Sequence, residues 1–225
     1  MAIYNLESKL SDILMIHPDL IPVVSRLGVS LGVGDFVVRE ICESHGIDAP
    51  FFLSVINTFI DPEYFPVNST DIFSLGKTVD YLDKTSDYYS QVQLPNIERH
   101  FHALIKMSRG DNNLSLLQHF FLEMKNQFSE TIVFEKSQLY PALRNNDFSK
   151  IENINDKAVN TEVEERLQDL LTFFVAHLKG DYDKNLCMAV VISVFSLYND
   201  VCQNNRIRKR ILLPLIDNLP KQKVQ

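Results

Sequence analysis

The segment NNRIRKRILLPL, residues 204–215, places a cation where a helix would bury it. Ile207 and Ile211 recur with the spacing of one helix face. Asn204 and Arg208 lie one turn apart near the middle of this apolar stretch. An Arg side chain keeps its proton in proteins, so a buried Arg needs a carboxylate or several acceptors nearby. The pattern therefore predicts a polar site in a protein core that includes Asn204 and Arg208.

Polar side chains interrupt three other apolar stripes in the same way. Ser86 lies within a stripe, Asn160 begins a helical period, and Glu130 and Phe134 stand one turn apart beside the apolar face of a long helix. Helix caps and exposed bundle edges would account for each of them singly. Together they place one or two special positions on each of four helices, with i,i+4 pairs on two. Helical bundles build metal sites from facing side chains in this way.

No catalytic signature accompanies these positions. The sequence has no GxGxxG, GxxxxGK[ST], GxSxG or HExxH, and its three cysteines show neither a CxxC pair nor zinc-ligand spacing. The six histidines lie outside the polar positions described above. We therefore predict no catalytic residue, no cofactor site and no metal ligand, and we expect the protein not to be an enzyme.

Composition is that of an ordinary folded protein, with 45% hydrophobic and 23% charged residues in a chain of 225. The net charge of -7 argues against nucleic-acid binding, and the basic cluster RIRKR at 206–210 is expected to be a solvated helix face. No run of the sequence approaches the 18 apolar residues of a membrane span, and the N-terminus lacks the pattern of a signal peptide. We expect a cytoplasmic protein that does not bind membranes.

Helical periodicity covers the whole chain and predicts an all-α protein. Residues 1–60 carry short helices that stop at glycines, residues 61–71 with two prolines form an expected linker, and residues 72–225 contain long amphipathic periods. These periods cover about 72–90, 94–107, 113–144, 161–179, 184–201 and 204–217. Long helices joined by modest loops indicate an antiparallel four-helix bundle preceded by a small helical N-terminal domain.

Several segments resemble the hemerythrin-like di-iron family, in the branch of iron–sulfur-cluster repair proteins with a small helical N-terminal domain. The segment HPDLIPVVSRLGVSLGVGDFVVREICESHGIDAPFFLSVIN is similar to that N-terminal domain. YLDKTSDYYSQVQLPNIERHFHALI, FSETIVFEKSQLYPAL, NTEVEERLQDLL and DVCQNNRIRKRILLPLI resemble the four bundle helices.

The resemblance implies six iron-ligand positions, and this chain retains none of them in kind. The family would have His, His, Glu, His, His and Glu there. This sequence has Ser86, Glu130, Phe134, Asn160, Asn204 and Arg208. Glu130 alone could bind a hard metal, and one carboxylate cannot hold two irons. The cysteine pair found in the N-terminal domain of many relatives is also missing.

These substitutions predict that the former metal site is closed by side chains. We expect Glu130 and Arg208 to form a buried ion pair between two helices, and Ser86, Asn160 and Asn204 to hydrogen-bond one another. The resemblance then implies a metal-free, degenerate hemerythrin-like protein that acts as a binding, sensing or regulatory partner, with a role in oxidative or nitrosative stress. We expect a protein partner of unknown identity and allow a homo-oligomer. The alternatives are a functional di-iron protein that repairs damaged iron–sulfur clusters and a small-molecule binder that uses the vacated cavity.

Overall fold

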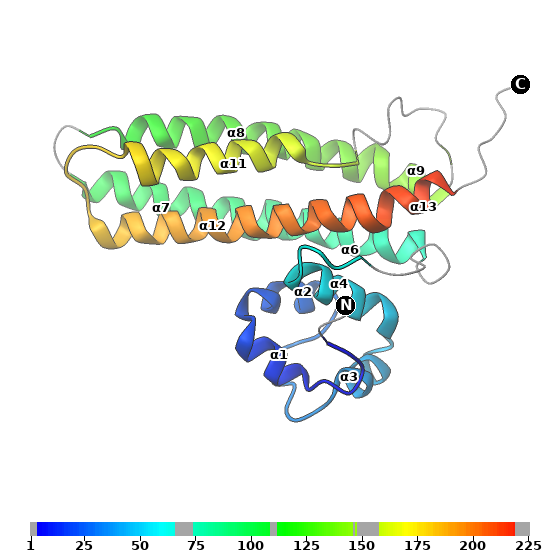
Figure 1. The fold of residues 1–225 in the computed structure, drawn as a ribbon. Helices are drawn as coiled ribbons and strands as arrows, with labels where there is room; N and C mark the ends of the chain where they lie inside the picture. The colour runs from blue at the N-terminus through cyan, green and yellow to red at the C-terminus, as the bar shows by residue number, and fades with distance from the viewer. Residues whose placement is uncertain (1–3, 66–73, 109–111, 146, 148–157, 219–225) are drawn as a thin grey trace, which may run out of the picture. The chain divides into compact units, whose positions relative to one another are not determined.

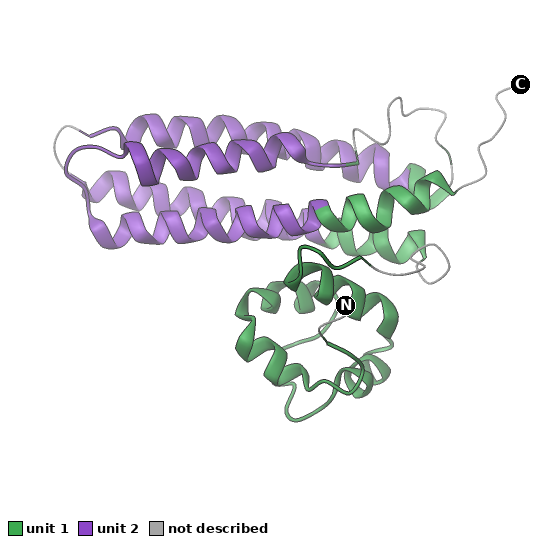
Figure 2. Ribbon diagram, viewed as in Figure 1, with its two compact units in different colours: residues 1–84, 142–158, 206–225 green, residues 85–141, 159–205 purple. Residues whose placement is uncertain are grey.

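The computed structural model describes residues 4–65, 74–108, 112–145, 147 and 158–218 of the chain. Within these ranges the regular structure is helical, and the β-type pairing is a single isolated bridge between Lys9 and Val37. The all-α prediction is confirmed. The chain forms two compact units, which Figure 2 colours separately. Unit 1 comprises residues 1–84, 142–158 and 206–225, and unit 2 comprises residues 85–141 and 159–205.

The N-terminal part of unit 1 consists of short helices, as the glycine and proline pattern predicts. These are α1 (Leu10–Ile16), the 3-10 turn η1 (Pro18–Leu20), α2 (Ile21–Arg26), α3 (Val38–His45) and α4 (Ala49–Ile60). Helix α3 ends at Gly46, whose φ of 63° is readily adopted only by a residue without a Cβ. The apolar faces of these helices supply side chains with no exposed surface, namely Leu10, Ile13, Leu20, Val23, Phe52, Val55 and Ile56.

Helix α4 is fixed at its start by a side-chain cap. The carboxylate of Asp48 accepts a hydrogen bond from the backbone N–H of Phe51 at 3.0 Å, and Pro50 occupies the first turn. Near the other end of α4, the buried Asn57 accepts from the N–H of Tyr4 at 3.0 Å and donates to its carbonyl at 3.1 Å. The chain before α1 is therefore tied to α4.

Unit 1 also includes residues far from the N-terminus, so its limits differ from the expected domain boundary. They are the part of α6 (Leu75–Tyr88) up to residue 84, the end of α9 (Tyr140–Asn145), and the C-terminal segment with α13 (Leu213–Asp217). The guanidinium of Arg144 donates to Asp80 and Asp83, each at 2.9 Å. The expected linker at 61–71 lies partly outside the described residues.

Two arginines of the basic cluster at 206–210 form hydrogen bonds within unit 1. The guanidinium of Arg206 donates to the carbonyl of Thr58 at 3.3 Å, and Arg210 donates to the carbonyls of Tyr64 and Pro62. Both arginines are half-buried, and of the outward basic residues Lys209 alone is exposed. The expectation of a fully solvated basic face is therefore wrong, because two of its cations bind backbone carbonyls.

Unit 2 is built from long helices that lie side by side in Figure 1. They are α7 (Leu94–Met107), α8 (Leu114–Phe134), α11 (Thr161–Thr172) and the part of α12 (Lys184–Ile207) up to residue 205. Their apolar stripes form one core. The rings of Phe101 and Phe121 stack within it, with centroids 5.2 Å apart. The predicted break between 201 and 204 is absent, because α12 continues through it.

The described residues contain four short π-helical segments. One, η4 (Phe173–His177), ends the helix that begins with α11, and each of the other three interrupts a helix and is followed by a proline two residues later. These three are η2 (Tyr89–Gln93), η3 (Glu135–Leu139) and η5 (Arg208–Leu212), which precede Pro95, Pro141 and Pro214. In each case the residue before the proline donates its N–H to the first residue of the segment, five positions back. Proline lacks an N–H, and its ring clashes with the carbonyl four residues earlier in a regular helix. The wider π turn gives the ring room.

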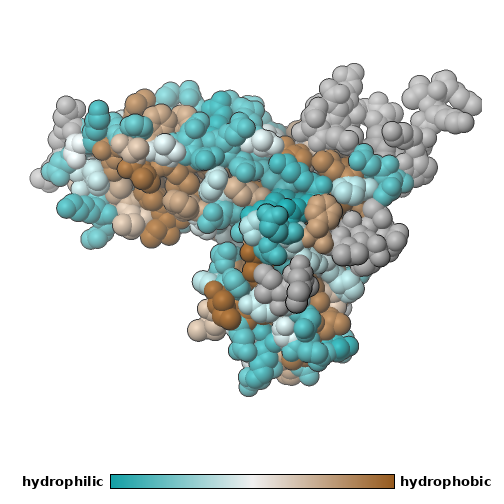
Figure 3. Space-filling model, in the orientation of Figure 1, coloured by the Kyte–Doolittle hydropathy of each residue, from teal (hydrophilic) through white to brown (hydrophobic). Residues whose placement is uncertain are grey.

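The outer face of α12 is apolar. Met188, Ile192 and Phe195 are 59%, 60% and 45% exposed, and Figure 3 shows hydrophobic surface over this part of unit 2. The run Lys184–Asp217 is long and apolar enough to span a membrane by length and composition alone, with a mean hydropathy of 1.5 over its best window. The run is broken by polar residues, so it is no continuous stretch of 18 apolar residues, and one helix of this kind is weak evidence for a membrane span. Core helices of soluble proteins meet the same criterion.

Candidate functional site

Four of the six former ligand positions predicted from the sequence are buried, and two are not. Ser86, Asn160, Asn204 and Arg208 are 1%, 7%, 2% and 1% exposed, so all four lie in the protein interior. Glu130 is exposed and Phe134 is half-buried. In unit 2 the buried positions belong to three hydrogen-bonded groups.

The first group joins Ser86, Glu135 and Tyr140. The Glu135 side chain has no exposed surface, and its Oε2 accepts from Ser86 Oγ at 3.0 Å and from Tyr140 Oη at 2.9 Å. The two hydroxyl oxygens lie 3.1 Å apart. Ser86 comes from α6, whereas Glu135 and Tyr140 stand at the two ends of the π turn η3. A buried carboxylate is thus held by two hydroxyls from distant parts of the chain.

Glu135, and not Glu130, is therefore the buried carboxylate of this helix. The buried stripe of α8 runs through Phe121, Met124, Phe128 and Ile132, and steps of three or four residues carry it on to Glu135. Glu130 lies two residues after Phe128 and so projects from the opposite side of the helix. Neither predicted position of this helix, Glu130 or Phe134, is fully buried, whereas Glu135, the residue after Phe134, is. A shift by one residue places the pair on Thr131 and Glu135.

The second group is centred on Asn204 in α12. Its side-chain amide donates to the hydroxyl of Tyr89 at 2.9 Å and to the carbonyl of Asp200, one turn earlier, at 2.8 Å. Tyr89 is 2% exposed, and its ring packs at 5.3 Å from that of Phe128. The hydroxyl of Tyr89 and the Asp200 carbonyl thus satisfy the NH2 group of this amide, whereas its buried Oδ1 has no hydrogen-bond partner among the described residues.

The third group joins the start of α11 to α12 through Asn205. The Asn205 side chain accepts from the backbone N–H of Asn160 at 3.0 Å and donates to the Asn160 carbonyl at 3.1 Å. Its amide also donates to the Glu164 carboxylate at 2.8 Å. Asn160 takes part through its backbone, and its side chain forms no cap hydrogen bond. Asn160 and Asn204 therefore bind different partners, and the predicted direct bond between them is wrong.

Arg208 belongs to unit 1 and is the bulkiest of the fully buried side chains in the described residues. Its Nη1 donates to the carbonyl of Ala158, itself buried in unit 1, at 3.1 Å. The burial predicted for Arg208 is confirmed. The predicted buried ion pair with Glu130 is wrong, because an exposed carboxylate cannot be its buried partner.

These groups consist of hydrogen bonds among side-chain amides, hydroxyls, backbone groups and two carboxylates, those of Glu135 and Glu164. The described ranges contain no cluster of three or more His, Cys, Asp or Glu side chains that could hold a metal ion. The buried thiols of Cys42 and Cys187 are also poor ligands for a metal ion. Burial raises the pKa of Cys42 to about 11 and raises that of Cys187, which disfavours the thiolate that binds metals.

Sequence reasoning missed four members of these groups: Glu135, Tyr140, Tyr89 and Asn205. Continuing the α8 stripe would have found Glu135. Tyr89 follows Ser86 at helical spacing, which predicts its burial but not its hydrogen bond with Asn204. Nothing in the spacing singles out Asn205, because its role depends on the approach of Asn160.

Comparisons with known proteins do not add a relative. No family model, curated protein or solved structure matches this chain. The residues themselves therefore carry the functional argument.

Proposed function

We propose that this chain is a metal-free relative of the hemerythrin-like proteins, with a four-helix bundle formed by unit 2, and that it acts without catalysis as a binding or regulatory partner of another protein. The observation that carries the proposal is the group formed by Ser86, Glu135 and Tyr140. In this group the one buried carboxylate of α8 and η3 accepts two hydroxyl hydrogen bonds at 3.0 and 2.9 Å, where a di-iron protein would use the carboxylate as a ligand.

The one-residue shift of register supports the resemblance on which this proposal draws. With the shift, the second position of the His-x-x-x-Glu pair becomes Glu135, a residue of the family's type with a buried side chain. The first position becomes Thr131, and the remaining positions in unit 2 stay Ser86, Asn160 and Asn204. None of these four replacements is a histidine, so the imidazole ligands are absent from unit 2 at all four positions.

The exposed apolar face of α12 supports a protein-binding role. Met188, Ile192 and Phe195 follow one another at helical spacing and remain more than two-fifths exposed. Contiguous apolar surface of this kind marks interaction sites.

The same helix also contributes to the core of unit 2. The buried Asn204 and Asn205 lie on it, and their side-chain amides donate hydrogen bonds to partners within unit 2. We accordingly propose a soluble, cytoplasmic protein that uses this helix in its core.

Iron analysis of protein expressed with excess iron tests the proposal. We expect substoichiometric iron and no oxo-bridge absorption band, because the ligand set cannot hold two cations. A matched portion treated with chelator should show the same thermal unfolding midpoint. Two irons per chain with an oxo-bridge band would overturn the metal-free proposal and favour the alternative of a di-iron protein.

A further inference from the structure

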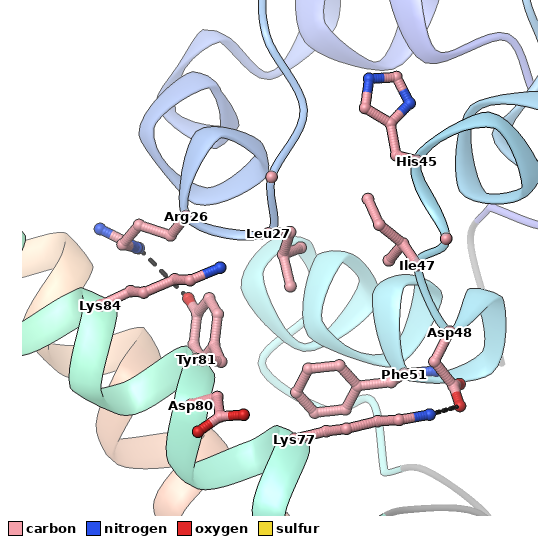
Figure 4. A pocket seen from close by; sticks show the side chains of 12 residues that line it. Arg26, Leu27, His45, Ile47, Asp48, Phe51, Lys77, Asp80, Tyr81 and Lys84 are labelled. Carbon is pink, nitrogen blue, oxygen red and sulfur yellow. Dashed lines mark hydrogen bonds and ion pairs between the residues drawn. The ribbon is translucent and has the colours of Figure 1, made fainter.

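Unit 1 contains a pocket of about 340 Å³, and none of its lining residues belongs to the three hydrogen-bonded groups of unit 2. Figure 4 shows its walls, which come from the end of α2, the turn between α3 and α4, the start of α4, and α6. Its volume lies in the lower part of the range of about 300–1,000 Å³ found for small-molecule sites. The pocket is therefore large enough for a small organic ligand.

The lining of this pocket carries more positive than negative charge. Three cations line it, Arg26, Lys77 and Lys84, against two carboxylates, Asp48 and Asp80. Both carboxylates are engaged. Lys77 Nζ lies 2.6 Å from Asp48 Oδ2, and Arg144, from outside the lining, binds Asp80 at 2.9 Å.

The positive charge gathers at one end of the pocket. Figure 4 shows Arg26 and Lys84 there beside the hydroxyl of Tyr81. The Arg26 side chain is 6% exposed, and its Nη2 donates to Tyr81 Oη at 3.2 Å while its guanidinium lies 5.6 Å from the Tyr81 ring centroid. Lys84 is exposed and forms no salt bridge within the described ranges. The buried guanidinium of Arg26 and the exposed ammonium of Lys84 thus both line the pocket near Tyr81.

Apolar surface forms another part of the lining. The rings of Phe51 and Tyr81 meet edge to face with centroids 6.3 Å apart, and Leu27 and Ile47 also line the pocket. Aromatic edges and faces favour a flat apolar group at such a wall. The pocket therefore combines a cationic end with an apolar wall, as small-molecule sites commonly do.

We propose that this pocket binds a small organic anion, with a carboxylate or phosphate group between Arg26 and Lys84 and an apolar body against Phe51 and Tyr81. A guanidinium recognises the planar geometry of a carboxylate or two oxygens of a phosphate, and an ammonium adds a point charge. The ion pair of Lys77 with Asp48 lies away from these two cations in Figure 4, and the Asp48 carboxylate disfavours a second anionic group there.

Calorimetric titration of the full chain with phenyl phosphate and, separately, phenylacetate tests the proposal. Benzyl alcohol serves as the neutral probe. We expect saturable binding of at least one anion and none of the alcohol, and the preferred anion identifies the group that is recognised. No heat of binding with either anion, or equal binding of the alcohol, would overturn the proposal.

A matched pair of charge reversals locates the binding. Lys84→Glu changes an exposed lysine that lines the pocket, and Lys106→Glu makes the same charge change on the exposed face of α7 in unit 2. We expect Lys84→Glu to weaken binding at least about tenfold, the loss of one charge-assisted hydrogen bond, and Lys106→Glu to leave it unchanged. Equal affinities in the two variants would refute this site, and circular dichroism verifies that both are folded.

Discussion

At the scale of single residues, Glu135 places a carboxylate in the interior of unit 2. Its carboxylate has no exposed surface and accepts hydrogen bonds from Ser86 and Tyr140. A buried carboxylate is costly unless such donors satisfy it, and the donors are in turn costly if they lose their acceptor. The three side chains therefore stabilise the fold only as a set.

Glu135→Ala and Glu130→Ala form a matched pair that tests this dependence. We expect Glu135→Ala to lower the free energy of unfolding by at least about 2 kcal/mol, because two buried hydroxyls lose their acceptor. Glu130→Ala should change it by less than about 0.5 kcal/mol, since Glu130 is exposed. Urea denaturation measures both. Equal losses would contradict the assignment of Glu135 as the buried carboxylate.

The sequence was sufficient to predict that Ser86, Asn160, Asn204 and Arg208 are not ordinary surface residues. Their burial follows from helical periodicity, which a single sequence contains. Their partners do not follow from it. Asn205 lies next to Asn204 and is equally buried, but its hydrogen bonds depend on where residue 160 approaches α12. Tertiary approach of this kind has no local signal.

At the scale of elements, the prolines at 95, 141 and 214 have a structural effect that periodicity alone does not specify. A proline in a helix predicts a kink or a restart. The structure instead continues each helix through a π turn. Two of these turns begin at Tyr89 and Glu135, which both belong to the buried polar groups. Such turns are frequent at functional sites, and they shift the helix face that follows.

Helix α4 offers a test of capping and of pH dependence. Burial alone would raise the pKa of the Asp48 carboxyl, but hydrogen bonds from Lys77 and from the Phe51 N–H outweigh it and lower the pKa below its ordinary value of 3.8. A lowered folded-state pKa contributes stability above the unfolded-state value and loses it as the pH falls through the folded-state value.

Asp48→Ala should therefore destabilise the protein by about 1 kcal/mol at neutral pH, the typical cost of removing a helix cap. The difference between the two proteins should shrink as the pH falls below 3.8, where wild-type Asp48 becomes protonated. Chemical denaturation across this pH range measures the difference in unfolding free energy, and Asp35→Ala serves as a control at an exposed carboxylate. A difference that stays constant in acid would show that the carboxylate charge is not involved.

Helix α12 combines a buried and an exposed apolar face, and two truncations compare them. Leu197 has no exposed surface, whereas Ile192 is 60% exposed. Leu197→Ala should cost about 2–5 kcal/mol of stability, and Ile192→Ala should stay within about 0.5 kcal/mol. Thermal and urea unfolding measure both variants. A large loss in Ile192→Ala would mean that this face is covered in solution.

At the scale of the whole molecule, the chain forms two compact units, each assembled from segments that are distant in the sequence. Residues 75–84, 142–145 and 206–217 belong to unit 1 together with the N-terminal helices. Contacts such as Arg206 with Thr58 and Arg26 with Tyr81 join positions 148 and 55 residues apart. The short N-terminal helices could be predicted from their glycines and prolines, but these long-range contacts could not.

The two units carry different proposed roles. The polar groups of unit 2 are closed by side chains of the chain itself, which supports a structural replacement of a metal site. The pocket of unit 1 has unbalanced positive charge and an apolar wall, which supports binding of a small anion. Loss of anion binding would leave the metal-free proposal unaffected, because no residue is shared between the pocket lining and the three polar groups.

Anomalous diffraction at the iron absorption edge, from crystals of protein produced in iron-rich medium, tests the metal-free interior most directly. The account predicts no anomalous peak near Glu135, with the carboxylate in hydrogen-bonding distance of Ser86 and Tyr140 as found here. A pair of bridged iron peaks beside Glu135 would contradict it.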